Sequence, residues 1–367
     1  MITIDDETAT LAPLEEREFV PAVEEQPKRK VRGLTRDEWL EYAMAFAAGA
    51  HLAVLLRFLL DWDDLMGTAL IVLVTFVGIH YLIVRERSTP EVAIDKTVTT
   101  IMWTVGLVLV GVLVWMVTFV TVKGLDQLRP SFLTTDLEQV GPLEEGGGAL
   151  HAIIGTAEQV GIATLFVVPV SILTAVYLHE IKGRMAGIIR FIVDALSGMP
   201  SIVAGLLIYT VWPIDGYSGV QASAALLILA IPIVTRGAEE VLRTVSDGLR
   251  ESSLALGAPQ WRVVLFVVLP TAQAGILTVT LLALARMVGE TAPVILTALG
   301  NSAINKNPFD GPQAALSWFV YDLIRVPNER QNARAWAGAL LLLIIVLIVF
   351  VAARVALARS ERRLGRR

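Results

Sequence analysis

Residues 251–270, with the sequence ESSLALGAPQWRVVLFVVLP, decide how the chain folds. Apolar residues recur at helical spacing from Glu239 to Leu256, with one polar face, which predicts an amphipathic helix. Gly257 is a typical helix stop, and Pro259 suits the first turn of a new helix. The stretch therefore predicts a helix, a turn and a second helix that carries a bulky apolar ridge.

The ridge contains Trp261, with the cation of Arg262 beside it. An apolar surface of this kind either seats in a groove of a partner protein or lies among lipid headgroups. The residues that flank the ridge are needed to distinguish these two interpretations.

Apolar runs flank this loop on both sides and continue along most of the chain. Of its 367 residues, 55% are hydrophobic and 18% are charged, which excludes an ordinary soluble protein. Runs of about 20 apolar residues cross a hydrocarbon core of about 30 Å. We expect an all-α polytopic membrane protein with about eight transmembrane helices, at about 41–60, 65–84, 98–122, 151–178, 186–212, 217–236, 270–299 and 333–357.

The distribution of Lys and Arg orients these spans. Twenty-one of them fall on the side that carries both termini and the 251–270 stretch, and about five fall on the other side. Because Lys and Arg collect in cytoplasmic loops, both termini and the stretch are expected in the cytoplasm.

Charge also divides the chain into parts. The net charge is −5, but residues 1–27 alone carry eight acids and one base, so the acidity belongs to the tail. We expect an acidic and then basic cytoplasmic tail over 1–40 and an accessory transmembrane hairpin with a cytoplasmic linker over 41–97. A core with a cytoplasmic loop at 239–270 follows over 98–360, and a basic tail over 361–367.

The seventh expected span is interrupted by charge, because Arg286 and Glu290 lie near its middle. A charge at that depth must face a partner or a wet cavity, and the two residues share a helix face. Pro293 removes the hydrogen bond that would use the Gly289 carbonyl, so a helix break is expected there. The pair is interpreted either as part of a path for an anion, since an Arg fork suits phosphate oxygens, or as a structural ion pair.

Two further groups of charges lie near the cytoplasmic side. Arg190 and Asp194 are four residues apart and are expected to pair with each other on one helix. Arg236 closes the sixth span and is either the inner mouth of an anion path or a positive-inside anchor.

Both the loop and the seventh span resemble known transporters. Glu251-Ser252-Ser253, Gly257 and Val267-Val268-Leu269-Pro270 have the spacing of the EAA signature of ABC importer permeases, with Ser for both Ala and Val for an Ile. Residues 284–296, LARMVGETAPVIL, are similar to the PstA-type permeases of phosphate ABC importers, and residues 190–205 resemble the GxPSIVxGL segment of that family. The resemblance covers about residues 95–360.

The resemblance implies a six-helix MetI-like permease core, here preceded by the two-helix hairpin, in the cell membrane. It implies a transmembrane permease subunit of an ATP-driven inorganic phosphate importer. The implied partners are a PstC-like permease that forms a heterodimer with it, two ABC ATPase subunits, an extracytoplasmic phosphate-binding protein and membrane lipid. No nucleic acid is expected.

The residue chemistry and the resemblance together assign expected roles. The residues expected to couple to the ATPase are Glu251, Gly257, Trp261, Arg262, Leu269 and Pro270. The expected substrate path contains Arg286, Glu290, Thr291 and Arg236, with a helix break at Gly289 and Pro293.

The sequence contains no motif for catalysis by this chain. It has no cysteine, no phosphate loop of the GxxxxGK[ST] type, no GxSxG elbow and no zinc spacing among its four His, so no catalytic residue and no metal site are predicted. No cofactor is expected on this chain, and ATP with Mg²⁺ is expected on partner subunits. The alternatives are a permease for another oxyanion such as molybdate or tungstate, an ion-coupled secondary transporter and a non-transporting membrane scaffold.

Overall fold

The chain is helical over the residues that its computed structural model describes, which are 35–59, 64–212 and 216–364. Within these ranges no strand occurs. Seven helices are long and apolar enough to cross a membrane, and a bent pair of shorter helices makes eight if it counts as one span. The expected class is confirmed. Most of the predicted tail, residues 1–34, lies outside the described residues.

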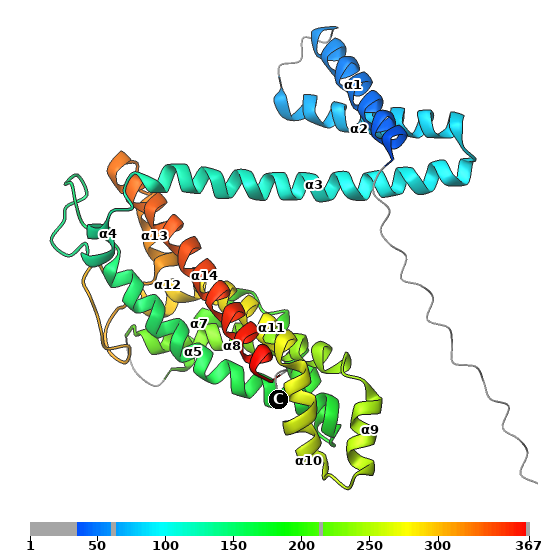
Figure 1. Cartoon of the computed structure of the whole chain (residues 1–367). Coiled ribbons are helices and arrows are strands. Elements are labelled where there is room, and N and C mark those ends of the chain that lie inside the picture. Colours follow the sequence, from blue (N-terminus) through cyan, green and yellow to red (C-terminus); the bar gives the residue numbers. More distant parts are fainter. Residues whose placement is uncertain (1–34, 60–63, 213–215, 365–367) are drawn as a thin grey trace, which may run out of the picture. The chain divides into compact units, whose positions relative to one another are not determined.

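Figure 1 labels most of the helices in chain order. They are α1 (Arg36–Leu59), α2 (Leu65–Arg87), α3 (Pro90–Leu125), α4 (Pro130–Thr134), α5 (Leu150–Val176), the π-helix η1 (Tyr177–Ile181), α6 (Ala186–Ser197), α7 (Ser201–Val211), α8 (Gly219–Arg243), α9 (Asp247–Ala255), α10 (Gln260–Val263), the π-helix η2 (Val264–Val268), α11 (Leu269–Gly289), α12 (Ala292–Ala298), α13 (Leu316–Ile324) and α14 (Glu329–Leu364).

The chain divides into two compact units between Gly111 and Val112, within α3. In the N-terminal unit, α1 and α2 pack against each other closely enough for the Thr75 hydroxyl to donate to the Gly49 carbonyl at 3.2 Å. The carboxylate of Glu41, which is nearly buried in α1, pairs with Arg87 at 3.3 Å. The pair lies near the start of α1 and at the end of α2, where Arg87 offsets the charge of the nearly buried carboxylate.

In the second unit, α5 and α8 lie side by side and α11 packs against α8. Their facing side chains form an apolar core that includes Val160 and Val167 of α5, Leu226 and Ala230 of α8, and Met287 of α11. Small residues at this seam bring the backbones close together, which is how helices associate in a membrane.

The fifth expected span, 186–212, is broken. Helices α6 and α7 meet at an angle of 109°. Pro200 has an extended backbone, and since it has no N–H it cannot donate to the Leu196 carbonyl one turn earlier. The chain therefore turns at the Gly198–Pro200 segment of the sequence motif.

The loop of residues 239–270 also differs from the expectation in two places. The helix predicted over Glu239–Leu256 is divided, because α8 ends at Arg243 and the extended Ser246 begins α9. The span predicted at 270–299 runs instead as one helix from Gln260 to Gly289. Pro270 does not start it, since the wide turn of η2 precedes this residue and lets the helix continue past the missing N–H.

Candidate functional site

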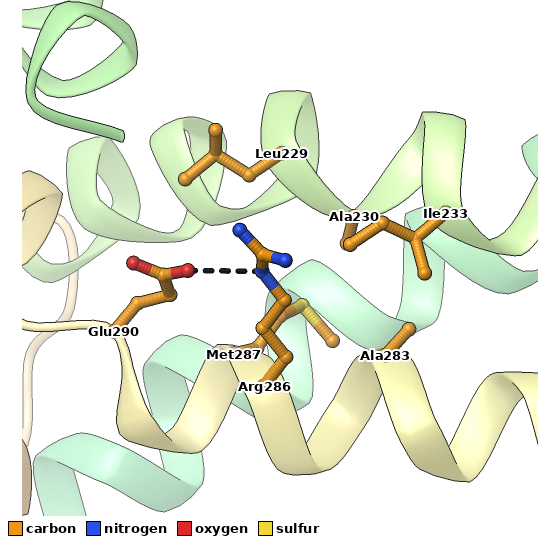
Figure 2. A pocket seen from close by; sticks show the side chains of 7 residues that line it. All are labelled: Leu229, Ala230, Ile233, Ala283, Arg286, Met287 and Glu290. Carbon is orange, nitrogen blue, oxygen red and sulfur yellow. Dashed lines mark hydrogen bonds and ion pairs between the residues drawn. The ribbon is translucent and has the colours of Figure 1, made fainter. Parts of the chain in front are cut away.

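The charged pair of the seventh span forms one compact centre. The Arg286 Nε donates to Glu290 Oε1 at 3.1 Å, as drawn in Figure 2. The Arg286 side chain is 61% exposed on this chain, whereas Glu290 is 16% exposed. Among the residues that the structure describes, the two terminal nitrogens of Arg286 have no hydrogen-bond partner, so the guanidinium is held at one edge and open at the other.

The surroundings of this pair are apolar. Arg286 extends toward α8, where Leu229, Ala230 and Ile233 face it (Figure 2). These residues lie midway along α8, a helix of 25 residues that is about 37 Å long. The pair therefore lies near the middle of a span, where a guanidinium attracts an anion much more strongly than it does in bulk water.

The side chains around the pair leave no cavity large enough for a water molecule. An anion therefore reaches Arg286 only from its exposed side or after the helices move.

The backbone opens directly after Glu290. Helix α11 ends at Gly289, Glu290 is extended, and α12 begins at Ala292 with Pro293 in its first turn. The Thr291 hydroxyl donates to the Gly289 carbonyl at 3.4 Å, and the Ser317 hydroxyl donates to the Glu290 carbonyl at 2.9 Å. Side chains thus occupy carbonyls that the helix leaves without an internal partner.

The two motif segments of the sequence lie directly against each other. A Cβ atom added to Gly205 of α7 would come within 2.8 Å of the Pro293 Cα in α12. Only glycine permits this approach, so the broken span α6–α7 supports the short helix that follows Glu290.

Two ion pairs join α6 to α8, and they correct the pairing expected from the sequence. Arg190 donates to Glu239 at 2.6 Å, and Asp194 accepts from Arg236 at 2.5 Å. Arg190 and Asp194 do not pair with each other, because each has a closer partner on the facing helix. Arg236 lies about one turn beyond Ile233 on α8 and does not line the Arg286 site, and its ion pair with Asp194 partly neutralises its charge.

The residues expected to couple to an ATPase form an exposed surface over α9, α10 and the start of α11. Gly257 turns the chain with a φ of +82°. Trp261 is 55% exposed, and the guanidinium carbon of Arg262 lies over its ring, 5.2 Å from the centroid. Glu251 and Pro270 are also exposed, and Leu269 is partly buried. Together they present a bulky aromatic anchor with a cation beside it.

Sequence reasoning missed one residue at this surface. Arg250 counted only as one of the positive charges that orient the spans, but it is the centre of a hydrogen-bond network that includes both oxygens of Glu180. No spacing signal joins residues 70 positions apart, so the sequence alone could not have revealed this contact. Within the described residues, no group of three or more His, Asp or Glu side chains could hold a metal ion.

Comparison with known proteins places these features in one family. Residues 167–365 match the family described as "Binding-protein-dependent transport system inner membrane component". Over 289 residues the chain is 39% identical to "Phosphate transport system permease protein PstA 1" of Mycobacterium tuberculosis. The matched region covers 77% of this chain and 92% of the relative. The chain belongs to the PstA family of phosphate transport permeases.

Another PstA, from Pasteurella multocida, is 38% identical over 254 residues, which are 68% of this chain and 89% of that relative. Among solved structures, the inward-facing MetNI methionine ABC transporter is similar at a TM-score of 0.48 and 19% identity, covering 57% of this chain and 94% of that one. The residues that match the family model, 167–365, include the EAA loop, the Arg286 centre and the broken span α6–α7.

Proposed function

We propose that this chain is the transmembrane permease subunit of an ATP-driven importer of inorganic phosphate. The observation that carries the proposal is the Arg286 centre. A guanidinium held by Glu290 on one edge and open on the other lies beside a helix break, midway along the spans. The names of the PstA relatives specify the substrate.

The exposed face of Arg286 favours a second permease subunit opposite it. A charge at the middle of a span costs at least about 2.5–3.5 kcal/mol unless a partner or a wet cavity receives it. A PstC-like permease that faces this side of α11 would enclose the guanidinium in a shared path. The phosphate would then pass between the two subunits.

The cytoplasmic surface supports the other partners. Two ATPase subunits would bind, one on each permease, and the Trp261 anchor would seat in a groove of one of them. When ATP binds, the two ATPase subunits close and move the loop of residues 251–270. The continuous helix from Gln260 to Gly289 carries that movement to Arg286. An extracytoplasmic phosphate-binding protein delivers the anion, and hydrolysis on the partner subunits resets the path.

The topology follows from the charge distribution. Both termini lie in the cytoplasm, and the chain spans the cell membrane several times. The permease itself is not an enzyme, because the chemistry of ATP hydrolysis belongs to the partner subunits.

Transport by the complete complex in proteoliposomes tests the proposal. Radiolabelled phosphate uptake driven by ATP is compared between wild type, Arg286→Gln and Glu290→Gln at equal protein. We expect Arg286→Gln to lower uptake at least about tenfold, because an uncharged amide keeps hydrogen bonds but loses the charge that stabilises the anion. Glu290→Gln should have a smaller effect, since it leaves the charge of Arg286 in place.

The matched control is Arg325→Gln, which removes a guanidinium that stacks on Tyr321 of its own helix, 5.0 Å from the ring centroid. This variant should transport as wild type does. If Arg286→Gln transports normally, the pair is structural and the path lies elsewhere. If wild type accumulates molybdate or tungstate but no phosphate, the importer class stands and the substrate is wrong.

A further inference from the structure

One guanidinium at the cytoplasmic end of the fold has every donor occupied. The Nε and one terminal nitrogen of Arg250 donate to the two oxygens of Glu180 at 3.3 and 2.9 Å. Further bonds go to Asp247 at 2.8 Å, the Val245 carbonyl at 2.6 Å and the Leu242 carbonyl at 2.8 Å, and one terminal nitrogen also lies 3.5 Å from His179 Nε2. An arginine has five N–H donors in a fixed fork, and all five are used here.

These bonds join three elements that the backbone alone does not hold together. Leu242 lies in the last turn of α8 and Val245 two residues beyond its end, Asp247 is the first residue of α9, and Glu180 belongs to η1. Both charges of the Arg250–Glu180 pair are nearly buried, at 14% and 9% exposure. Breaking such a pair leaves an uncompensated charge, which makes the contact stiff.

Helix α9 has little apolar packing. None of its nine residues is buried, and its main packing contacts are with α10 and η2, not with η1. One nearby bond adds to the connection, because the Gln260 side chain donates to the Glu180 carbonyl at 2.9 Å. Among the described residues, the hydrogen bonds that join α9 directly to η1 all come from Arg250.

From η1 a continuous path leads to the Arg286 centre. The π-helix directly extends α5, whose Val160 and Val167 lie in the same apolar core as Met287 and Val288. Met287 is the neighbour of Arg286 and lines the same site. A displacement of η1 along its axis thus reaches the far side of the charged centre through closely packed side chains.

We propose that Arg250 is a positioning residue that transmits the movement of α9 to α5. The loop then drives two helices, α11 through the unbroken backbone from Gln260 and α5 through the Arg250–Glu180 contact. Movement of α5 and α11 together opens the path beside Arg286, whereas movement of α11 alone does not. This inference rests on the proposed function, because it concerns how ATP hydrolysis is converted into transport.

The test is the number of phosphate ions imported per ATP hydrolysed by the complete complex in proteoliposomes. Arg250→Gln should lower this ratio about tenfold while the complex still assembles and hydrolyses ATP, because the fork is lost and the ATPase surface is kept. Arg250→Lys should also lower it, since a single ammonium cannot bridge Glu180 and three further acceptors at once. The matched control is Arg243→Gln, an exposed arginine whose ion pairs lie on its own helix, which should leave the ratio unchanged.

A purely structural role would lower assembly, hydrolysis and transport together and leave the ratio as in wild type, and that result would overturn the inference. If Arg250→Gln fails to assemble, Glu180→Gln provides the same test, because it removes the charge from η1 and leaves the carbonyl contacts of Arg250 intact. The Glu180→Gln and Arg250→Gln changes combined should lower the ratio no further than Arg250→Gln alone, and additive losses would contradict a shared contact. A wild-type complex that imports no phosphate refutes the proposed function itself, whatever the variants do.

Discussion

The contact between Gly205 and Pro293 allows a prediction whose size follows from the structure. In Gly205→Ala, the added Cβ would lie 2.8 Å from the Pro293 Cα, 3.2 Å from its carbonyl oxygen and 3.3 Å from the Leu296 Cβ. Ordinary van der Waals contact begins near 3.4 Å, so the closest approach is too short by about 0.6 Å. The groups that must yield belong to the backbone of α12 and not to a flexible side chain.

Overpacking of this kind costs about 1–3 kcal/mol and is relieved by moving α12 away from α7. Because Thr291 alone separates α12 from Glu290, the movement displaces the carboxylate that holds Arg286. We expect Gly205→Ala to lower ATP-driven phosphate uptake about tenfold, as displacements of under an ångström at a precisely arranged site can do. Uptake and the thermal stability of the purified complex are measured on the same preparations.

The matched control is Gly161→Ala in the middle of α5, where an added Cβ meets nothing within 4 Å. This variant should be neutral, or more stable by up to about 1 kcal/mol through its helix propensity. If Gly205→Ala keeps both the stability and the uptake of wild type, α12 yields without consequence, and the support of the Arg286 centre by α7 is refuted.

Further predictions concern the coupling surface and the helix contacts. Trp261→Ala should abolish co-purification of the ATPase without unfolding the permease, because it removes an exposed aromatic anchor; retained ATPase would contradict a docking role. Gly257→Ala should cost about 1 kcal/mol at a φ of +82° and weaken the same co-purification. Asp194→Arg should lower stability by placing two cations together, and Arg236→Asp in the same chain should restore it, as thermal melting would show. Ser317→Ala should lower uptake with a stability loss of about 1 kcal/mol, since it removes the donor to the Glu290 carbonyl.

Hydropathy predicts the fold class because membrane thickness constrains it directly. A run of about 20 apolar residues has few alternatives to a spanning helix, so the approximate number of spans follows from sequence. The ends of the helices follow less well. Pro270 is an expected helix start, but η2 lets the helix pass through it, and only the structure shows this π-turn.

Partner choice between helices is the part that sequence could not predict. Arg190 and Asp194 are correctly spaced for one another, yet the rotation of α6 against α8 brings Glu239 and Arg236 closer. The same limit hid Arg250, whose partner Glu180 is 70 residues away. Spacing rules describe one helix at a time, whereas these contacts depend on how two helices face each other. By contrast, the Arg286–Glu290 contact lies within one turn, and its spacing makes it accessible to sequence reasoning.

The exposure of Arg286 has a consequence for how cells make this protein. If the proposed second permease subunit covers this face, a copy made without it leaves the guanidinium without that cover, which costs at least about 2.5–3.5 kcal/mol where the face meets lipid. The residue proposed to attract the anion would thus also favour assembly, because pairing of the two subunits removes that cost.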